Sequence, residues 1–313
     1  MPFEPVILFF LLGLCAGLIR SDLKIPGVLY ESLSIFLLLA IGLKGGVELA
    51  RYPLMELALP GLIVVLVATL IPLTAFPLLH RVGRLPRADA ASIAAHYGSV
   101  SVVTFAVASS FLAARGVSAE GYMVVFLVLL EFPALMIGVA IARRGSASAK
   151  WGPLLHEVFS GKSIVLLLGG LIIGWVAGAE GIKPLDRLFF DLFKGMLALF
   201  LLEMGLVAAG RLADLRRAGP FLLAFATVMP LCAGLLGVVT ANFLDLSVGG
   251  AVLLATLYAS ASYIAAPAAM RIAVPEANPA ISIGAALGIT FPFNLLVGIP
   301  AYHWLAVRLQ GVI

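Results

Sequence analysis

The chain has 313 residues, of which 62% are hydrophobic and only 12% are charged, and its mean hydropathy is +1.14. Such a chain lacks the polar side chains needed to cover a water-soluble globule, which excludes a soluble protein. The formal net charge of +4 is better explained by membrane topology than by a nucleic acid or another acidic partner. The composition therefore predicts an all-α polytopic membrane protein.

Ten apolar stretches are long enough to form helices that cross a bilayer, which takes about 20 residues each. In chain order they cover residues 5–20, 28–50, 57–80, 88–114, 120–142, 161–179, 185–211, 219–243, 249–274 and 279–307. Only an acidic charge precedes the first stretch, so we expect a retained helix rather than a cleaved signal. When the stretches alternate across the membrane, 13 Lys and Arg residues lie on the cytoplasmic side and 5 on the outer side. The positive-inside rule then predicts a multi-pass protein of the cell inner membrane with both termini outside.

Similarity between the two halves of the chain predicts an internal repeat. The segment "IGLKGGVEL" resembles "MGLVAAGRL", and Phe132-Pro133 resembles Phe291-Pro292, at offsets of about 159–163 residues. Each copy holds five predicted spans, and since five is odd, the second copy must enter the membrane in the opposite orientation. We therefore expect ten transmembrane helices in a 5+5 inverted-topology repeat. The domains expected are the first repeat, a short basic cytoplasmic linker and the second repeat, at residues 1–143, 144–160 and 161–313.

Two serine-rich segments, "HYGSVSVVTF" and "LYASASYIAA", occupy matching positions in spans four and nine. Ser99 and Ser101 of the first segment are two residues apart, as are Ser260 and Ser262 of the second. Helical side chains at that spacing point about 200° apart, so both reach one ligand only if the helix is interrupted. Pro267 favours an interruption, because proline is tolerated in the first turn of a new half-helix. We expect both spans to be discontinuous and to cross at the midplane, although the serines could instead serve only helix packing.

Such a crossing suits a small anion bound together with sodium. The N-termini of half-helices offer unpaired N–H groups and a positive dipole end to an anion. Hydroxyl oxygens, and carbonyl oxygens at the ends of half-helices, suit sodium. Neither break contains a charged side chain, so we expect the anion to be small and to bind beside a cation.

Other polar residues at membrane depth are further candidates. In span ten, Thr290 lies near Asn294, whose amide either coordinates an ion or satisfies freed backbone groups. Glu131 in span five and Glu203 in span seven are each either a cation ligand or proton carrier, or a structural residue. His96 either bonds a neighbouring helix or takes part in proton coupling.

The remaining features of the spans have structural explanations. Lys44 and Glu48 are one turn apart, which favours an ion pair, although Lys44 could instead pair with Glu203, or these side chains could extend to the membrane surface. The motifs "GLCAG", "GGLIIGWVAG" and "GAALG" have small residues at the spacing that favours close helix packing. Cys15 and Cys232 lie in apolar stretches, and the sequence offers neither a disulfide nor a metal-binding framework.

Four segments together resemble the sodium-dependent bicarbonate transporter family known from cyanobacteria: "AIGLKGGVEL", "HYGSVSVVTF", "ASASYIAAPAAMR" and "PEANPAISIGAALGITFPFNLLVGIPAY". The resemblance implies a homotrimer whose protomers each have a gate domain and a core domain with crossed broken helices. It also implies that sodium and bicarbonate bind together at the crossing, which is similar to the fold of sodium/bile-acid symporters. The site residues that the resemblance implies are Gly98, Ser99, Val100, Ser101, Ala259, Ser260 and Ser262.

The resemblance also raises the question of a regulator. Cyanobacterial members are similar but carry a longer cytoplasmic segment between the halves, and a signalling protein of the nitrogen-regulator type docks on that face. This chain has only the short linker, which counts against such a partner.

These features predict a secondary active transporter that couples sodium to bicarbonate uptake by alternating access. The substrate-binding residues expected are Gly98, Ser99, Val100, Ser101, Ala259 and Ser260. The sodium-binding residues expected are Ser101, Ser260, Ser262, Asn294, Thr290 and Glu131. Sodium is the coupling ion, and no cofactor is expected. The alternatives are a sodium-coupled carrier for another small anion or carboxylate and a sodium/proton antiporter, whereas an enzyme is disfavoured because no HExxH or GxSxG motif occurs.

Overall fold

The computed structural model describes residues 4–143, 152, 156, 159–215 and 219–311, with the side chains of 212–215 left undescribed. The described part is helical and contains no strand. Most of the predicted linker, 144–160, lies outside the described residues.

The helices follow the apolar stretches in chain order. The first half contains α1 (Pro5–Leu18), α2 (Gly27–Leu49), α3 (Leu54–Ala68), α4 (Leu70–Pro77), α5 (Arg87–Gly98), α6 (Val102–Ala113), α7 (Met123–Glu131) and α8 (Pro133–Ala142). The second half contains α10 (Lys162–Ile182), α11 (Phe193–Leu215), α12 (Gly219–Phe243), α13 (Val248–Ala259), α14 (Ala265–Ala273), α15 (Pro279–Ile283), α16 (Phe291–Phe293) and α17 (Ile299–Gln310). Wider π-helical turns η4 (Gly284–Thr290) and η5 (Asn294–Gly298) join α15, α16 and α17 into one long element.

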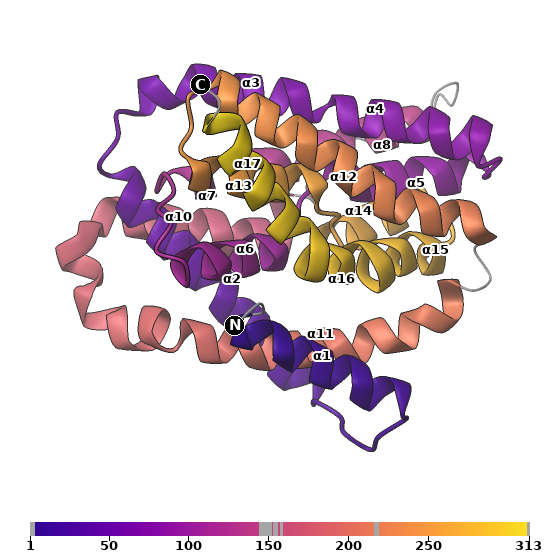
Figure 1. Cartoon of the computed structure of the whole chain (residues 1–313), viewed down its shortest axis with the longest axis horizontal. Coiled ribbons are helices and arrows are strands. Elements are labelled where there is room, and N and C mark those ends of the chain that lie inside the picture. The colour runs from indigo at the N-terminus through magenta and orange to yellow at the C-terminus, as the bar shows by residue number, and fades with distance from the viewer. Residues whose placement is uncertain (1–3, 144–151, 153–155, 157–158, 216–218, 312–313) are drawn as a thin grey trace.

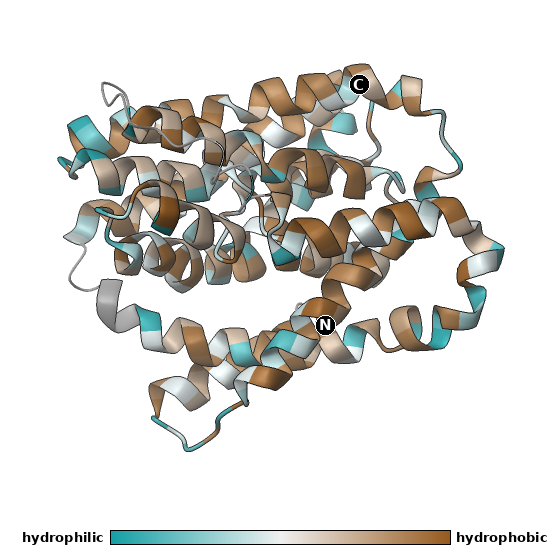
Figure 2. Ribbon diagram, turned by 180° about the vertical axis from the view of Figure 1, so that it is seen from behind, coloured by the Kyte–Doolittle hydropathy of each residue, from teal (hydrophilic) through white to brown (hydrophobic). Residues whose placement is uncertain are grey.

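Eight helices of the described chain are long and apolar enough to cross a membrane, so this is a polytopic membrane protein. They are Gly27–Leu49, Leu54–Val82, Arg87–Ala113, Met123–Ala142, Lys162–Leu185, Phe193–Arg211, Gly219–Phe243 and Pro279–Gln310. The other two predicted spans correspond to the shorter apolar helices Pro5–Leu18 and Val248–Ala259. The first is only 14 residues long, and the second is half of a span that the chain interrupts. Hydropathy colouring shows the same pattern, with hydrophilic residues gathered at loops and helix ends (Figure 2).

Two pairs of helices pack closely through glycines. The α1–α11 pair lies along the lower edge of Figure 1, and α2 packs against α10. A Cβ on Gly13 would lie 3.2 Å from the Cα of Gly205, and one on Gly170 would lie 3.2 Å from the Cα of Gly42. Only residues without a side chain allow this approach, so the packing role predicted for "GLCAG" and "GGLIIGWVAG" is confirmed. The third motif, "GAALG", lies in η4, which packs against α11.

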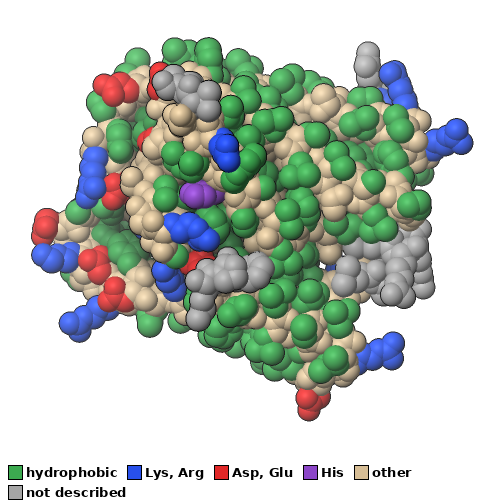
Figure 3. Space-filling model, in the orientation of Figure 1, with side chains coloured by type: hydrophobic (Ala, Val, Ile, Leu, Met, Phe, Trp, Pro, Cys, Tyr) green, Lys and Arg blue, Asp and Glu red, His purple; other side chains and the backbone are tan. Residues whose placement is uncertain are grey.

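The remaining helices form a second group that surrounds α5 and α6. Helix α5 packs against α4, α8 and α14, and α6 packs against α13. The most apolar 18-residue window of the Arg87–Ala113 element is wholly buried inside the protein. The face seen in Figure 3 is largely apolar instead, with broad patches of hydrophobic side chains, and its charged side chains gather mainly toward the ends of the long axis. The other helices shield the Arg87–Ala113 element from lipid, so polar groups in this element can find hydrogen-bond partners within the protein.

The ion pair predicted for Lys44 and Glu48 is wrong. Glu48 instead accepts a hydrogen bond from Arg51 at 3.0 Å, and the Lys44 side chain is exposed. Arg51 lies at the end of α2, where its side chain reaches the carboxylate one turn back. The observed partner lies three residues after Glu48, whereas the predicted one lies four residues before it.

Candidate functional site

The first chain break separates α5 from α6 within the buried fourth element. Helix α5 ends at Gly98, Ser99 is extended (φ −90°, ψ 169°), and α6 begins after Ser101. The Ser101 hydroxyl accepts a hydrogen bond from the Thr104 N–H at 3.2 Å, which caps the new helix. The interruption expected at this motif is therefore present.

The second break has nearly the same geometry. Helix α13 ends at Ala259, and Ser260 is extended with φ −80° and ψ 164°. Helix α14 begins at Ala265, and the Ser262 hydroxyl accepts a hydrogen bond from the Ala266 N–H at 3.2 Å. Pro267 lies in the first turn of α14, where its missing N–H has no helical partner to lose.

The two breaks contact each other directly. The Ser101 N–H donates to the Ser260 hydroxyl oxygen at 2.9 Å, and the Ser262 N–H donates to the His96 carbonyl at 2.8 Å. The Ser260 hydroxyl donates in turn to the Leu257 carbonyl at 2.9 Å. All four serines are buried, with no more than 5% of their surface exposed. Backbone groups that the helices leave unpaired are thus satisfied by the opposite break, 159 residues away in the Ser101–Ser260 pair.

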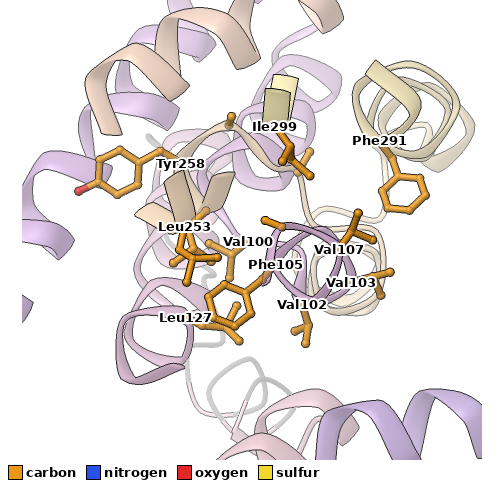
Figure 4. Close-up of a cluster of buried hydrophobic side chains, with 14 of the residues drawn as sticks. Val100, Val102, Val103, Phe105, Val107, Leu127, Leu253, Tyr258, Phe291 and Ile299 are labelled. Atoms are coloured by element: carbon orange, nitrogen blue, oxygen red, sulfur yellow. The ribbon is translucent and has the colours of Figure 1, made fainter. Parts of the chain in front are cut away.

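Glycine and apolar residues shape the break around Val100. Val100 lies among apolar side chains that include Phe105 of α6, Leu127 of α7 and Leu253 of α13 (Figure 4). A Cβ on Gly98 would lie 2.7 Å from both Ala134 and Pro72, so this position accepts only glycine without rearrangement. The side chain of Val100 therefore anchors the break, and only its backbone is available to a ligand.

The side chain of Asn294 is hydrogen-bonded to the second break. Its amide donates to the carbonyl of Ala259 at 2.9 Å, and its Oδ1 accepts a hydrogen bond from the Tyr302 hydroxyl at 2.9 Å. Asn294 is fully buried. Of the two roles open from the sequence, the structure shows the satisfaction of a carbonyl that a helix end leaves free. The sequence analysis missed Tyr302, although its place two turns after Asn294 could have suggested the contact.

Thr290 lies beside the first break but does not contact its serines. Its hydroxyl donates to the Ala226 carbonyl of α12 at 2.7 Å and lies 2.6 Å from the Tyr97 hydroxyl, which therefore donates to it. Thr290 connects span ten to α5 and α12. Tyr97 was part of the quoted serine motif, yet nothing in its spacing indicated this partner.

Glu131 lies against the first break through its backbone. The Ser99 hydroxyl donates to the Glu131 carbonyl at 3.2 Å, and the Glu131 side chain is 2% exposed. One carboxylate oxygen, Oε2, is buried without a hydrogen-bond partner in the described part of the protein. Glu203, by contrast, is partly exposed on α11. Of the two glutamates left open by the sequence, only Glu131 adjoins the crossing.

The two chain breaks offer an ion oxygen ligands and helix ends, and the breaks themselves contain no Lys or Arg side chain. Serine hydroxyls, break carbonyls and the Glu131 carboxylate are hard oxygen donors, which suit sodium. Among the described residues, no group of three or more His, Cys, Asp or Glu is placed to hold a metal ion. The N-termini of α6 and α14 begin at the breaks and present positive dipole ends there.

Comparison with known families identifies the family of this chain. The family model described as the Na+-dependent bicarbonate transporter superfamily matches residues 5–307 of the 313-residue chain. The chain belongs to this superfamily. A comparison with curated proteins gives no match. Membership in the Na+-dependent bicarbonate transporter superfamily indicates a transporter rather than an enzyme. It also implies that sodium and bicarbonate are the ions concerned.

The match includes both chain breaks and the Pro279–Gln310 element as far as Val307. The serines that the sequence singled out, Asn294 and the Glu131 backbone therefore lie together inside the matched region. Thr290 lies inside it as well but is bonded to Ala226 and Tyr97.

Proposed function

We propose that the protein is a symporter that couples inward movement of sodium to uptake of bicarbonate across the cell inner membrane. The observation that carries this proposal is the contact between two helix breaks, in which the Ser101 N–H bonds to the Ser260 hydroxyl. Irregular backbone at membrane depth is tolerated where protein buries it or where it lines a site. Two such breaks in contact, in a chain of the sodium-dependent bicarbonate superfamily, favour an ion site at the membrane midplane.

Different groups at the crossing would bind the anion and the sodium ion. The backbone N–H groups in the first turns of α6 and α14 would hold the anion with the Ser99 and Ser260 hydroxyls. Break carbonyls, with nearby hydroxyls and the Glu131 carboxylate, would hold sodium beside it. Co-binding lets the ions neutralise each other, since the breaks themselves contain no charged side chain.

Alternating access would follow from relative movement of two helix groups around the crossing. The matching dihedral angles of Ser99 and Ser260, at equivalent positions of the two halves, support a 5+5 inverted repeat. The α1–α11 and α2–α10 pairs would form the gate group, and the helices around α5 and α6 the core group. Each net positive charge that moves inward gains about 2.3 kcal/mol per 100 mV of membrane potential.

Assembly and orientation also form part of the proposal. We propose a homotrimer in the inner membrane with both termini outside, on the basis of the family resemblance and the distribution of Lys and Arg. Native mass spectrometry tests the trimer. An impermeant thiol reagent tests the orientation, because it would label Lys183→Cys from outside and leave Lys24→Cys unlabelled.

The decisive experiment is uptake of radiolabelled bicarbonate into proteoliposomes with and without an inward sodium gradient. We expect uptake to require the gradient and Ser260→Ala to abolish it, because the bond that joins the breaks is lost. Ser32→Ala is the matched control, since Ser32 is exposed on α2 and bonds only to the carbonyl of Val28 in its own helix. Sodium-driven uptake of another small anion or a carboxylate, but not of bicarbonate, would change the substrate. Uptake indifferent to sodium would rule out symport.

Sodium/proton exchange is a second candidate, favoured by the unpartnered carboxylate oxygen of Glu131. A buried carboxylate beside the crossing could exchange a proton for sodium. Glu131→Gln keeps the shape but removes the charge. If the protein is a symporter, this variant should slow sodium-driven bicarbonate uptake without creating or removing any proton flux, as measured with an internal pH dye. Sodium-driven proton flux that the variant abolishes would favour the antiporter.

A further inference from the structure

A small cavity lies between α5, α14 and α15, next to the crossing but outside it. Its volume is about 80 Å³, which is room for a few waters or one small ion, since a water occupies about 30 Å³ of liquid. Its polar lining comes from three elements, namely Ser92 and His96 on α5, Arg271 on α14 and Ser282 on α15. The rest of the lining is apolar and includes Pro267. The positive-inside rule puts this cavity on the cytoplasmic half of the protein.

His96 gives the cavity a buried hydrogen-bond acceptor. Its Nδ1 lies 2.7 Å from the carbonyl oxygen of Ser92, and because a carbonyl only accepts, Nδ1 must carry the hydrogen. In the neutral ring, Nε2 is then the acceptor. The side chain is only 1% exposed, and Nε2 has no partner among the described residues. An unpaired buried acceptor costs free energy, so this nitrogen favours a ligand that brings a donor.

Arg271 gives the cavity its positive charge. It supplies the charged side chain of the lining, and it is exposed, so the cavity is accessible from the end of α14. A guanidinium binds oxyanions through pairs of N–H groups. The Ser92 hydroxyl adds a group that can donate to the same anion, whereas the Ser282 hydroxyl already donates to the Pro279 carbonyl at 3.3 Å.

A cavity lined by one free acceptor, one cation and the Ser92 hydroxyl fits an oxyanion that carries its own O–H group. Bicarbonate has one O–H donor and a delocalised negative charge, whereas nitrate has the charge without the donor. The wall of the cavity is also the wall of the second break, because the His96 carbonyl accepts the Ser262 N–H at 2.8 Å.

We propose that this cavity is a second site for a small protonated oxyanion of the bicarbonate class, on the cytoplasmic side of the crossing. The proposal rests on the proposed function, because it places the site where bicarbonate released inward would next be held. His96 Nε2 accepts the O–H of the anion, and Arg271 pairs with its charge. The site is separate from the serines of the crossing, so the two can be removed one at a time.

The test measures binding of radiolabelled bicarbonate to purified full-length protein in detergent at constant pH. Ser260→Ala removes the crossing site. In this background we expect sodium-independent binding to remain, nitrate to compete poorly, and added Arg271→Gln to weaken affinity at least tenfold. Lys24→Gln is the matched control, since it removes an exposed cytoplasmic-side cation away from the cavity and should change nothing. His96→Phe keeps a ring of similar size and should remove the preference for bicarbonate over nitrate.

The outcomes separate the two proposals. If Ser260→Ala protein binds no bicarbonate while the unmodified protein binds it, the second site is wrong and the proposed function stands. Equal affinity with and without Arg271→Gln would also overturn the second site. If the unmodified protein binds no bicarbonate with or without sodium, both proposals are wrong.

Discussion

At the scale of single residues, Asn294 shows how a polar side chain satisfies a backbone carbonyl at an interrupted helix. Helix α13 ends at Ala259, so its last carbonyls lose their helical partners. The Asn294 amide donates to one of them, and the Tyr302 hydroxyl fixes the other end of the Asn294 side chain. The Tyr302 hydroxyl also lies 3.1 Å from the Pro230 carbonyl, so these side chains connect α12, α13 and span ten. A fully buried network of this kind holds the break in one conformation.

We expect Asn294→Ala to lower the free energy of unfolding by about 1–3 kcal/mol, because it leaves a buried carbonyl unpaired. Thermal unfolding in detergent, with and without sodium, measures the loss. The loss should be the same in both conditions. Tyr302→Phe should cost less, because it keeps the hydrogen bond from the Asn294 amide to the Ala259 carbonyl. A loss confined to samples with sodium would instead make Asn294 an ion ligand.

At the scale of elements, each interrupted span uses a serine to begin its second half. Ser101 caps α6 and Ser262 caps α14, so each hydroxyl replaces a helical partner at a helix start. The serine before each cap is extended, and of these two Ser260 bonds to the opposite break whereas Ser99 bonds to the Glu131 carbonyl of α7. Pro267 prevents α14 from extending backward as a regular helix, because it offers no N–H to the residue four positions earlier. The half-helices are therefore encoded locally, by caps and a proline.

Two proline variants of α14 should behave oppositely. Pro267→Ala should retain the fold and cost at most about 1 kcal/mol, because the first turn needs no N–H there. Ala269→Pro should cost about 3 kcal/mol or more, because it removes a helical bond and clashes with the preceding turn. Unfolding temperature and sodium-driven uptake of the two variants provide the comparison. Similar behaviour of both would show that α14 does not begin at Ala265.

At the scale of the whole molecule, Glu4 joins the α1–α11 pair to the helices around the site. It precedes α1, and the Ser110 hydroxyl of α6 donates to its carboxylate. Burial raises the pKa of Glu4 above its usual value of 4.5, and the Ser110 bond with the charges of Lys194 and Arg115 partly offsets the rise. If the two helix groups move during transport, this contact must break and re-form.

The raised pKa of Glu4 predicts a pH dependence of stability. The folded protein holds this proton more tightly than the unfolded chain, so stability is greatest below pH about 4.5 and falls as pH rises through the folded pKa. Glu4→Gln should remove that fall, and Glu180→Gln, an exposed carboxylate, should not. Unfolding temperature from pH 4 to 8 is the measurement. An unchanged slope in Glu4→Gln would assign the pH dependence to another group.

Some properties of this protein could be read from its sequence, because they depend on local pattern. Hydropathy located the helices, glycine spacing indicated close packing, and the serines with Pro267 indicated where two spans are interrupted. Each of these signals acts within one or two helical turns or along one apolar stretch.

The tertiary structure alone decided which groups meet. Ser101 bonds to Ser260, Asn294 to Ala259 and Thr290 to Tyr97 across 159, 35 and 193 residues. Such partners depend on how whole helices pack, which no local pattern specifies. Even at short range, Glu48 pairs with Arg51 rather than with Lys44 because the fold brings the Arg51 side chain to its carboxylate. The sequence by itself determined a membrane protein with two broken spans, and the packing of those spans determined that their breaks lie in contact.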